Sequence, residues 1–421
     1  MTSDAAINPS GVPTQTLIAL MSAVFTVSIG FGVLLPLLPY LLERLLNPTV
    51  GSVSVAWNTG LLTSIYTLAL FLFAPLWGRM SDRHGRRGIL LLGMIGFAAS
   101  MLGFSIVESL PVLYAERFVS GMFAAAVVPI ASATIADLAA SDESRARRLT
   151  MVSLAGISGF LVGPMIGVFM ARAASSIFTS TSPSGSVAGP LDATAVLALL
   201  VAVAIKLTIP AKPSRPGLAR SLDAIFADGR LVQKLLVLVF IVSSGVGVFE
   251  VGLALRGKQE LGLTQYQIAA MFTECSLVMI VAQAIVFSPL VRPASTRWLI
   301  TPALAVLAVG LFLVPRASSF SMMLVVIGAV SASAGILSPI LTYWISRRSG
   351  DAQGARLGQQ TAAASLGSAV GAALGGLLYT VTAVPGAPFA VMGVLAIGGI
   401  GLALRLPAVL GQPLRAFSFR T

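Results

Sequence analysis

Long apolar runs separated by short polar breaks extend along almost the whole of the 421-residue chain. A helix needs about 20 apolar residues to cross the hydrocarbon core of a bilayer. Helices also satisfy their own backbone hydrogen bonds where no water is available. Twelve runs are long enough, and they cover residues 16–42, 57–77, 88–107, 112–137, 150–172, 191–210, 234–257, 266–288, 298–315, 320–345, 357–381 and 387–405. The sequence therefore predicts an all-α membrane protein with twelve transmembrane helices.

The balance of charge supports the same class. Only 10% of the residues are charged, whereas an ordinary soluble domain has about 25%. The net charge of +12 would by itself suggest nucleic acid as a partner. The Lys and Arg residues, however, fall in the breaks between apolar runs and form no basic stripe. We therefore expect the lipid bilayer as a partner and no nucleic acid.

The distribution of basic residues predicts the orientation in the membrane. When the breaks are assigned alternately to the two sides, 21 Lys and Arg residues fall on one side, 5 on the other, and Arg117 lies inside a run. Cytoplasmic loops carry the excess of Lys and Arg, so both termini are predicted to be cytoplasmic. The first run is longer than the apolar region of a signal peptide and no Lys or Arg precedes it, so we expect it to remain as the first span.

The chain divides into two related halves. The longest polar break on the basic side, residues 210–233, separates six runs from six. We therefore predict an N-terminal six-helix bundle over residues 1–209, a cytoplasmic linker over 210–233 and a C-terminal six-helix bundle over 234–421. Gly159-x-x-x-Gly163 recurs 208 residues later as Gly367-x-x-x-Gly371, and parallel repeats of six spans are a known transporter plan.

Three motifs of the first half resemble those of the major facilitator superfamily. The break after the second run, Gly78-Arg79-Met80-Ser81-Asp82-Arg83-His84-Gly85-Arg86-Arg87, is similar to the signature loop of that family. Arg117-x-x-x-Gly121 resembles its second motif. Gly159-x-x-x-Gly163-Pro164-x-x-Gly167 resembles the motif of its proton-coupled exporters. The chain is thus identified as similar to the twelve-helix drug:proton antiporter branch, which implies two bundles around a central cavity in a bacterial cytoplasmic (inner) membrane.

The resemblance implies that the signature loop is a conformational latch between the halves. Asp82 is expected to accept backbone N–H groups at a nearby helix start and to pair with an arginine. Asp137, at the end of the fourth run, is within expected reach of Arg86. The alternative is that the arginines only set topology. The latch residues are Gly78, Asp82, Arg83, Gly85, Arg86, Arg87 and Asp137.

The glycines of the fifth run recur every four residues and make one smooth helix face. Gly159, Gly163 and Gly167 permit close helix approach, and Pro164 permits a bend. Helix packing alone explains this pattern. The resemblance adds a second interpretation, a flexible seam between the halves of an exporter.

Arg117 is a charge inside a predicted span, which makes a functional role the default expectation. The resemblance implies that it faces the cavity and tunes a proton site. The alternative is that it extends to the outer surface, about two turns away. A tight pair with Glu116 is not expected, because adjacent helical residues point about 100° apart.

Glu250 and Glu274 lie in the seventh and eighth runs at a similar depth below the outer surface. A carboxylate in hydrocarbon costs several kcal/mol, so each is expected to face a cavity or to be protonated. Two close carboxylates would hold one proton tightly. The hypothesis is that this pair carries the coupling proton, a cationic substrate, or both in competition. The alternative is that Glu250 pairs with Arg256 or Lys258 near the outer interface.

The chain departs from the resembling exporters in its first run, which has no acidic residue in its core. This departure puts the N-terminal proton site of those relatives in doubt here. The loop after the eighth run also lacks the Asp-Arg-x-Gly-Arg pattern.

No catalytic or cofactor motif is found. The chain has no nucleotide-binding fingerprint, so we expect no enzyme activity, no cofactor, and a proton gradient as the energy source. Met271, Cys275 and Met279 suggest packing more than a soft-metal site, so no metal is expected. The predicted function is export of amphipathic, drug-like and cationic small molecules in exchange for protons by a monomer. The alternative is a carrier of one specific metabolite.

Overall fold

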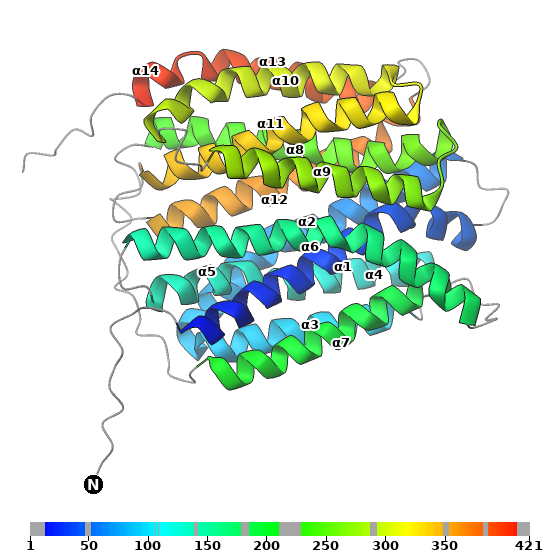
Figure 1. The fold of residues 1–421 in the computed structure, drawn as a ribbon, viewed down its shortest axis with the longest axis horizontal. Helices are drawn as coiled ribbons and strands as arrows, with labels where there is room; N and C mark the ends of the chain where they lie inside the picture. The colour runs from blue at the N-terminus through cyan, green and yellow to red at the C-terminus, as the bar shows by residue number, and fades with distance from the viewer. Residues whose placement is uncertain are drawn as a thin grey trace, which may run out of the picture. The chain divides into compact units, whose positions relative to one another are not determined.

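The computed structural model of the protein is helical throughout the part of the chain that it describes, residues 13–46, 52–105, 107, 109–138, 142–177, 185–209, 229–286, 293–347, 353–381 and 386–410. The α-helices in chain order (Figure 1) are α1 (Thr14–Leu45), α2 (Ser52–His84), α3 (Arg86–Ser105), α4 (Leu110–Ala124), α5 (Val127–Leu138), α6 (Asp142–Ile177), α7 (Gly185–Thr208), α8 (Gly229–Gln259), α9 (Gln265–Val286), α10 (Ile300–Leu313), α11 (Phe320–Arg347), α12 (Gln353–Leu377), α13 (Ala387–Ala403) and α14 (Leu406–Leu410). Two short 3-10 helices, η2 (Pro293–Leu299) and η3 (Val314–Arg316), flank α10.

Ten segments of the described chain are long and apolar enough to cross a membrane. They correspond to the first ten predicted runs. The two remaining runs are helical but do not reach the same combination of length and hydropathy. Helix α13 has 17 residues, and α12 carries Gln, Thr and Ser side chains among its apolar residues. The all-α membrane class is therefore confirmed, whereas the number twelve and the side on which the termini lie stay predictions.

Two of the spans are not single α-helices. The fourth consists of α4 and α5, which are joined by a turn at Ala125 and Ala126. The ninth, which is short in the sequence, is lengthened at both ends by the 3-10 turns η2 and η3, so that it covers Ser295–Arg316. These turns explain how a run of only 14 α-helical residues reaches the length that a bilayer requires.

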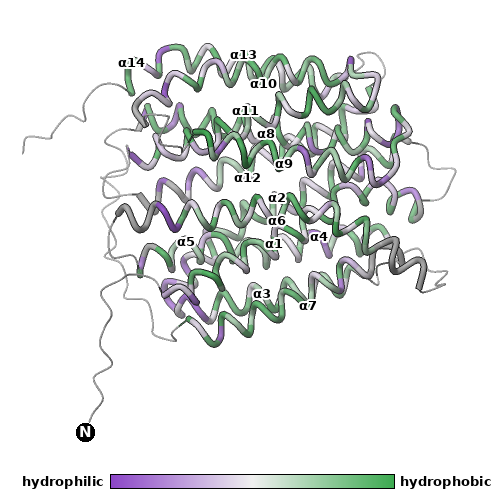
Figure 2. The backbone as a smooth tube through the Cα atoms, viewed as in Figure 1, coloured by the Kyte–Doolittle hydropathy of each residue, from purple (hydrophilic) through white to green (hydrophobic). Residues whose placement is uncertain are grey.

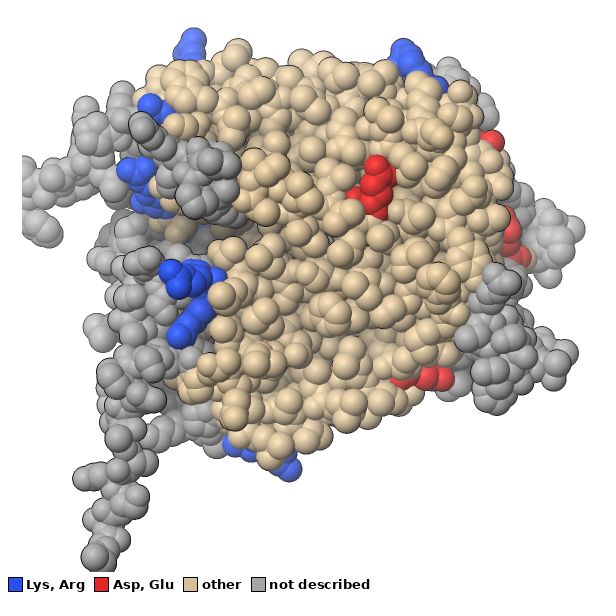
Figure 3. Space-filling view, in the orientation of Figure 1, with Lys and Arg blue, Asp and Glu red and all other residues tan. Residues whose placement is uncertain are grey.

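Apolar side chains cover the outward faces of the helices as well as the faces that contact other helices. Leu207 is 79% exposed, Val325 is 75% exposed, and many other large apolar residues are exposed on the same helices. Hydrophobic segments occupy the middle of the helices and hydrophilic ones gather near the ends (Figure 2). The broad face in Figure 3 carries almost no charge away from its edges, apart from one acidic patch. Such a surface suits lipid as its solvent.

The packing of the helices divides the chain into two compact units. Unit 1 comprises Met1–Leu46 and Ala69–Leu218, and unit 2 comprises Asn47–Leu68 and Ala219–Thr421. Helix α2 therefore contributes its first part to unit 2 and its second part to unit 1. The division after Leu218 falls within the predicted linker 210–233, whose residues 210–228 lie outside the described part of the chain.

The glycine motif of α6 lies against α1 in unit 1. A methyl group at Gly163 would lie 2.9 Å from the carbonyl oxygen of Ile29, and one at Gly167 would lie 3.1 Å from Cγ1 of Val33. A methyl group at Gly159 would collide with the carbonyl oxygen of Phe25. Only glycine allows the two backbones to approach this closely.

Unit 2 repeats this arrangement between α12 and α8. A methyl group at Gly367 would lie 2.5 Å from the carbonyl oxygen of Phe240, and one at Gly375 would lie 3.3 Å from Cα of Val248. A methyl group at Gly371 would collide with the carbonyl oxygen of Ser244. The partner residues in both units recur every four positions, so the glycine repeat in the sequence corresponds to a repeated helix pair in the structure.

Candidate coupling and latch sites

The charged block from Gly78 to Arg87 is not the loop that the sequence predicts. Helix α2 continues to His84 and α3 begins at Arg86, so only Gly85 separates them. Gly85 has a φ of 92°, a left-handed conformation that glycine adopts without strain. Arg83 and His84 occupy the last turn of α2, where positive charge is favourable for the helix dipole. The block is therefore two helix ends joined by a one-residue turn.

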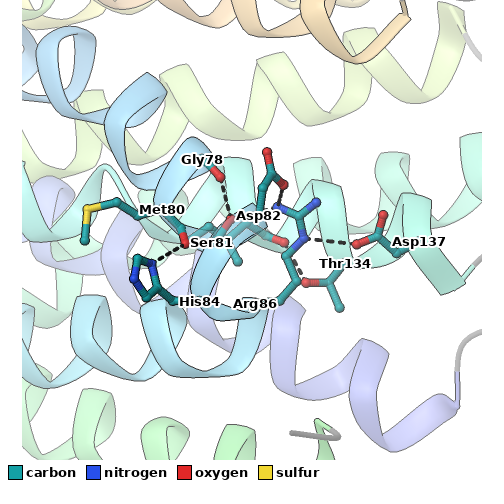
Figure 4. Close-up of polar contacts among 9 residues, drawn as sticks. Gly78, Met80, Ser81, Asp82, His84, Arg86, Thr134 and Asp137 are labelled. Atoms are coloured by element: carbon teal, nitrogen blue, oxygen red, sulfur yellow. Dashed lines mark hydrogen bonds and ion pairs between the residues drawn. The ribbon is translucent and has the colours of Figure 1, made fainter. Parts of the chain in front are cut away.

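Arg86, the first residue of α3, is the centre of a polar cluster beside this turn (Figure 4). Its Nη1 lies 2.5 Å from Oδ1 of Asp82, and its Nε donates a hydrogen bond to Oδ2 of Asp137 at 3.0 Å. A third donation, from Nη1 to Oγ of Ser81, measures 2.7 Å. The guanidinium thus joins the end of α2, the start of α3 and the end of α5, all within unit 1. Asp82 is paired with an arginine, as expected, and a hydrogen bond from a backbone N–H group to its carboxylate stays a prediction.

Ser81 is a member of this cluster that sequence reasoning missed. Its hydroxyl donates to the carbonyl oxygen of Gly78 at 2.8 Å while accepting from Arg86. Its full burial holds the oxygen in place for the guanidinium. The only feature of the sequence that could have indicated its role is its position, directly before the motif aspartate Asp82.

Three other residues of the signature motif lie near Gly85 and differ in their burial. Arg83 is exposed and Arg87 is partly buried. A methyl group at Gly78 would meet no described atom within 4 Å. Packing in this conformation therefore does not require glycine at position 78.

Arg117 is buried to 1% exposure in α4. This burial rules out the alternative in which its guanidinium extends to the outer surface. The neighbouring Glu116 is also buried, at 7% exposure, and its carboxylate interacts with the Arg117 charge. Both side chains lie on the buried face of α4, together with Ser120, because that face is wider than the 100° that separates adjacent residues.

Glu250 is buried in α8 at 9% exposure. The alternative in which it pairs with Arg256 is wrong, since Arg256 binds Glu260, one turn further along the chain; the alternative pair with Lys258 stays a prediction. Arg256 also donates from Nη2 to the carbonyl oxygens of Pro315 and Ala317, at 2.8 and 2.9 Å. Glu250 is left in the apolar interior of unit 2.

Glu274 is half-buried in α9 and faces α11. Its Oε1 lies 3.9 Å from the position of a methyl group on Gly328. Its Oε2 is buried and has no hydrogen-bond partner among the described residues. The thiol of Cys275 lies beside Ser331 of α11 and interacts electrostatically with both Glu250 and Glu274. Each carboxylate therefore lies within electrostatic range of Cys275, and the described residues show no hydrogen bond between Glu250 and Glu274.

The Met and Cys stripe of α9 packs against α11. Met271 and Cys275 are buried, and a methyl group on Gly335 of α11 would lie 2.9 Å from Cα of Met279. Among the described residues, no group of three or more His, Cys, Asp or Glu is placed to hold a metal ion. This geometry favours packing as the role of the stripe.

A second polar cluster, which sequence reasoning also missed, lies at the end of α8. The hydroxyl of Tyr379 donates to Oε1 of Glu260 at 2.6 Å, and Arg256 binds the other carboxylate oxygen. Arg256 and Glu260 are separated by one helical turn, but Tyr379 is 119 residues from Glu260. Only the fold brings the three together.

Comparison with known proteins agrees with the helical architecture. Residues 20–295 match the family model described as Major Facilitator Superfamily. Multidrug resistance protein 2 of Bacillus subtilis (strain 168) is 28% identical over 92% of this chain and 94% of its own length. The quinolone resistance protein NorA of Staphylococcus aureus (strain MRSA252) is 25% identical over 85% of this chain and 88% of its own length.

Solved structures show the same fold at lower identity. The crystal structure of the human organic anion transporter MFSD10 covers 93% of this chain and all of its own, with a TM-score of 0.69 and 22% identity. That of a D-xylose-proton symporter covers 93% of this chain and 96% of its own, with a TM-score of 0.73 and 16% identity.

Proposed function

Because the chain belongs to the major facilitator superfamily, we propose that it exports amphipathic small molecules, including cationic and drug-like ones, in exchange for protons by alternating access. The observation that carries this proposal is the burial of Glu250 in an apolar helix, with Glu274 on the neighbouring helix α9. The names of the bacterial relatives, a multidrug resistance protein and a quinolone resistance protein, support efflux as the direction of transport.

A buried carboxyl group can couple a proton to a substrate. A carboxylate in an apolar interior is costly without a partner, so Glu250 is neutral when no cation is near it. A cationic substrate stabilises the ionised form and displaces the proton. The same site, facing the other side of the membrane, binds a proton again and releases the cation. Glu274 takes part in this exchange through its buried Oε2. Arg117, in unit 1, is proposed to tune a proton site there.

The turn centred on Arg86 is proposed to act as the latch. Its contacts with Asp82 and Asp137 hold α2, α3 and α5 in one arrangement. Movement of any one of these helices stretches an ion pair whose arginine is largely buried, which is more costly than the loss of an exposed pair. The proposed latch therefore separates two arrangements of unit 1, whereas the resemblance implies a latch between the halves. The driving force is the proton gradient across a bacterial cytoplasmic membrane, no cofactor takes part, and a monomer is sufficient.

The test uses purified protein in liposomes with ethidium as the cationic probe. An imposed proton gradient should drive ethidium transport by the wild type, and Glu250→Gln and Glu274→Gln should each lower the gradient-driven rate. Glu43→Gln, at the exposed end of α1, is the matched control and should leave the rate unchanged. Proton-driven transport that persists unchanged in both Glu250→Gln and Glu274→Gln would refute the proposed coupling role.

A further inference from the structure

The buried face of α4 carries a carboxylate that no motif accounts for. The buried residues of this helix are Leu113, Glu116, Arg117, Ser120, Gly121 and Ala124. Both carboxylate oxygens of Glu116 are buried, and neither has a hydrogen-bond partner among the described residues. Most buried polar atoms in proteins are hydrogen-bonded, so a carboxylate in this condition calls for an explanation.

The surroundings of Glu116 include a charge that can balance it. Arg117 interacts with the carboxylate, and Ser120 lies nearby, although the Ser120 hydroxyl donates to the carbonyl oxygen of Arg117 at 3.1 Å. Glu116 lies about 9 Å along the axis from the first residue of α4, inside the span Leu110–Ile135.

The three helices seen to contact α4, which are α3, α5 and the second part of α2, bring no further charge to this depth within the described chain. Helix α3 carries titratable residues only at its start, Arg86 and Arg87. Helix α5 carries only Asp137, at its far end. The second part of α2, which contacts α4 through Trp77 and Phe73, carries Arg79, Asp82, Arg83 and His84 in its last two turns. These groups belong to the turn around Arg86, at the opposite end of the span.

These observations leave Glu116 with two states. When it is ionised, the Arg117 charge offsets part of the cost of burial. When it is protonated, that cost disappears, and the attraction to Arg117 is lost with it. Burial favours the neutral acid, and the adjacent cation favours the carboxylate. A carboxyl group under these two opposing effects is suited to gain and lose a proton as its exposure to water changes.

We propose that Glu116 is a proton-binding residue of unit 1, acting with Arg117 and distinct from Glu250 and Glu274 of unit 2. A proton from water adds to a carboxylate oxygen of Glu116 to form the neutral acid. The same O–H bond breaks when the group ionises, and the proton returns to water. No other bond changes. The inference rests on the proposed function in that such a proton serves transport, and it supplies a site that the uncharged core of α1 lacks.

The experiment measures the protonation of Glu116 directly. Infrared difference spectra of the full chain in liposomes, recorded between acidic and alkaline buffer, report the carbonyl band of protonated carboxyl groups. The wild type should show a band that is lost in Glu116→Gln and kept in a Glu250→Gln, Glu274→Gln double variant. In Arg117→Gln this band should persist to more alkaline buffer, because the balancing cation is gone, whereas Arg117→Lys should change it less.

Spectra of Glu116→Gln that match the wild type at every pH would overturn the inference. If Glu116→Gln does not fold, Glu116→Asp serves in its place and should keep the band at a shifted frequency; an unshifted band also overturns the inference. The spectra need no substrate, so their outcome is separate from that of the proposed function. If ethidium transport by the wild type does not depend on the proton gradient, the proposed function is contradicted, even if the spectra show that Glu116 gains and loses a proton.

Discussion

Gly60 of α2 and Gly376 of α12 lie in direct backbone contact. A methyl group on Gly60 would lie 2.6 Å from Cα of Gly376, and one on Gly376 would lie 2.7 Å from Cα of Gly60. Close to them, the Nε1 of Trp57 donates to Oγ1 of Thr380 at 3.0 Å, and Ala56 packs in a buried cluster with Ala372. This contact attaches the first part of α2 to unit 2.

Replacement of Gly376 by Leu should separate these two helices. The added side chain has no room beside Gly60, so we expect a loss of about 1–3 kcal/mol in the free energy of unfolding. Spin labels at Val53 and Val381, both exposed in unit 2, should report longer distances in the variant. Gly398→Leu is the control, because a methyl group at Gly398 meets no described atom within 4 Å. Equal distance distributions in Gly376→Leu and the control would contradict this prediction.

The glycine face of α6 should be sensitive to a single methyl group. Gly163→Ala places a carbon 2.9 Å from the carbonyl oxygen of Ile29, and we expect it to lower stability by about 1–3 kcal/mol. Thermal unfolding in detergent, followed by tryptophan fluorescence, measures the change. Gly103→Ala in α3 has open space around it and should unfold close to the wild-type temperature. A Gly163→Ala protein as stable as Gly103→Ala would show that α1 moves aside without cost.

Asp137→Asn tests whether the Arg86 cluster matters more for transport than for stability. The lost ion pair is half-exposed on the Asp137 side, so the free energy of unfolding should fall by less than about 1 kcal/mol. The proposed latch role predicts that ethidium transport slows by about tenfold, which corresponds to ~1.4 kcal/mol in the barrier. Asp192→Asn in α7 makes the same chemical change elsewhere and should transport normally. Transport by Asp137→Asn at the wild-type rate would leave Arg86 with a structural role alone.

Tyr379→Phe should weaken the cluster at the end of α8. The variant loses the hydrogen bond to Glu260 while keeping the ring in its contact with the buried cluster around Val251 and Leu255. Because Glu260 is 44% exposed, we expect a loss of only about 1 kcal/mol. Chemical unfolding curves measure it. Tyr343→Phe is the control, since the hydrogen bond between the Tyr343 oxygen and Arg347 is long, at 3.4 Å, and the two variants should differ clearly in midpoint.

Most of the helical architecture was predictable because an apolar run of bilayer length has few alternatives to a helix. The ends of the helices were less predictable. Residues 88–107 were predicted as the third span, yet α3 begins at Arg86 and α2 extends to His84, because charged residues are tolerated in helix ends that reach water. The single turn residue, Gly85, stood out in the sequence only as a member of the signature motif, and its left-handed conformation is visible only in the structure.

The residues of the candidate sites, like the helices, were only partly predictable from the sequence. Arg86, Asp82 and Asp137 stood out in the sequence because charge is rare in this chain. Ser81 and Tyr379 did not, because a polar neutral residue near a span end is common. No tight pair between Glu116 and Arg117 was expected, and both carboxylate oxygens of Glu116 indeed have no hydrogen-bond partner among the described residues; only the structure showed that both side chains lie on the buried face of α4.

The sequence by itself determined that this protein is a bundle of membrane helices with glycine faces in both halves, because run length, charge and glycine spacing act locally along the chain. Only the tertiary structure decided that Arg86 joins three helices, that Arg256 binds Glu260 and leaves Glu250 in an apolar interior, and that Glu116 is buried beside Arg117. The physical reason is that the cost of a charge in the membrane depends on which side chains of distant helices surround it.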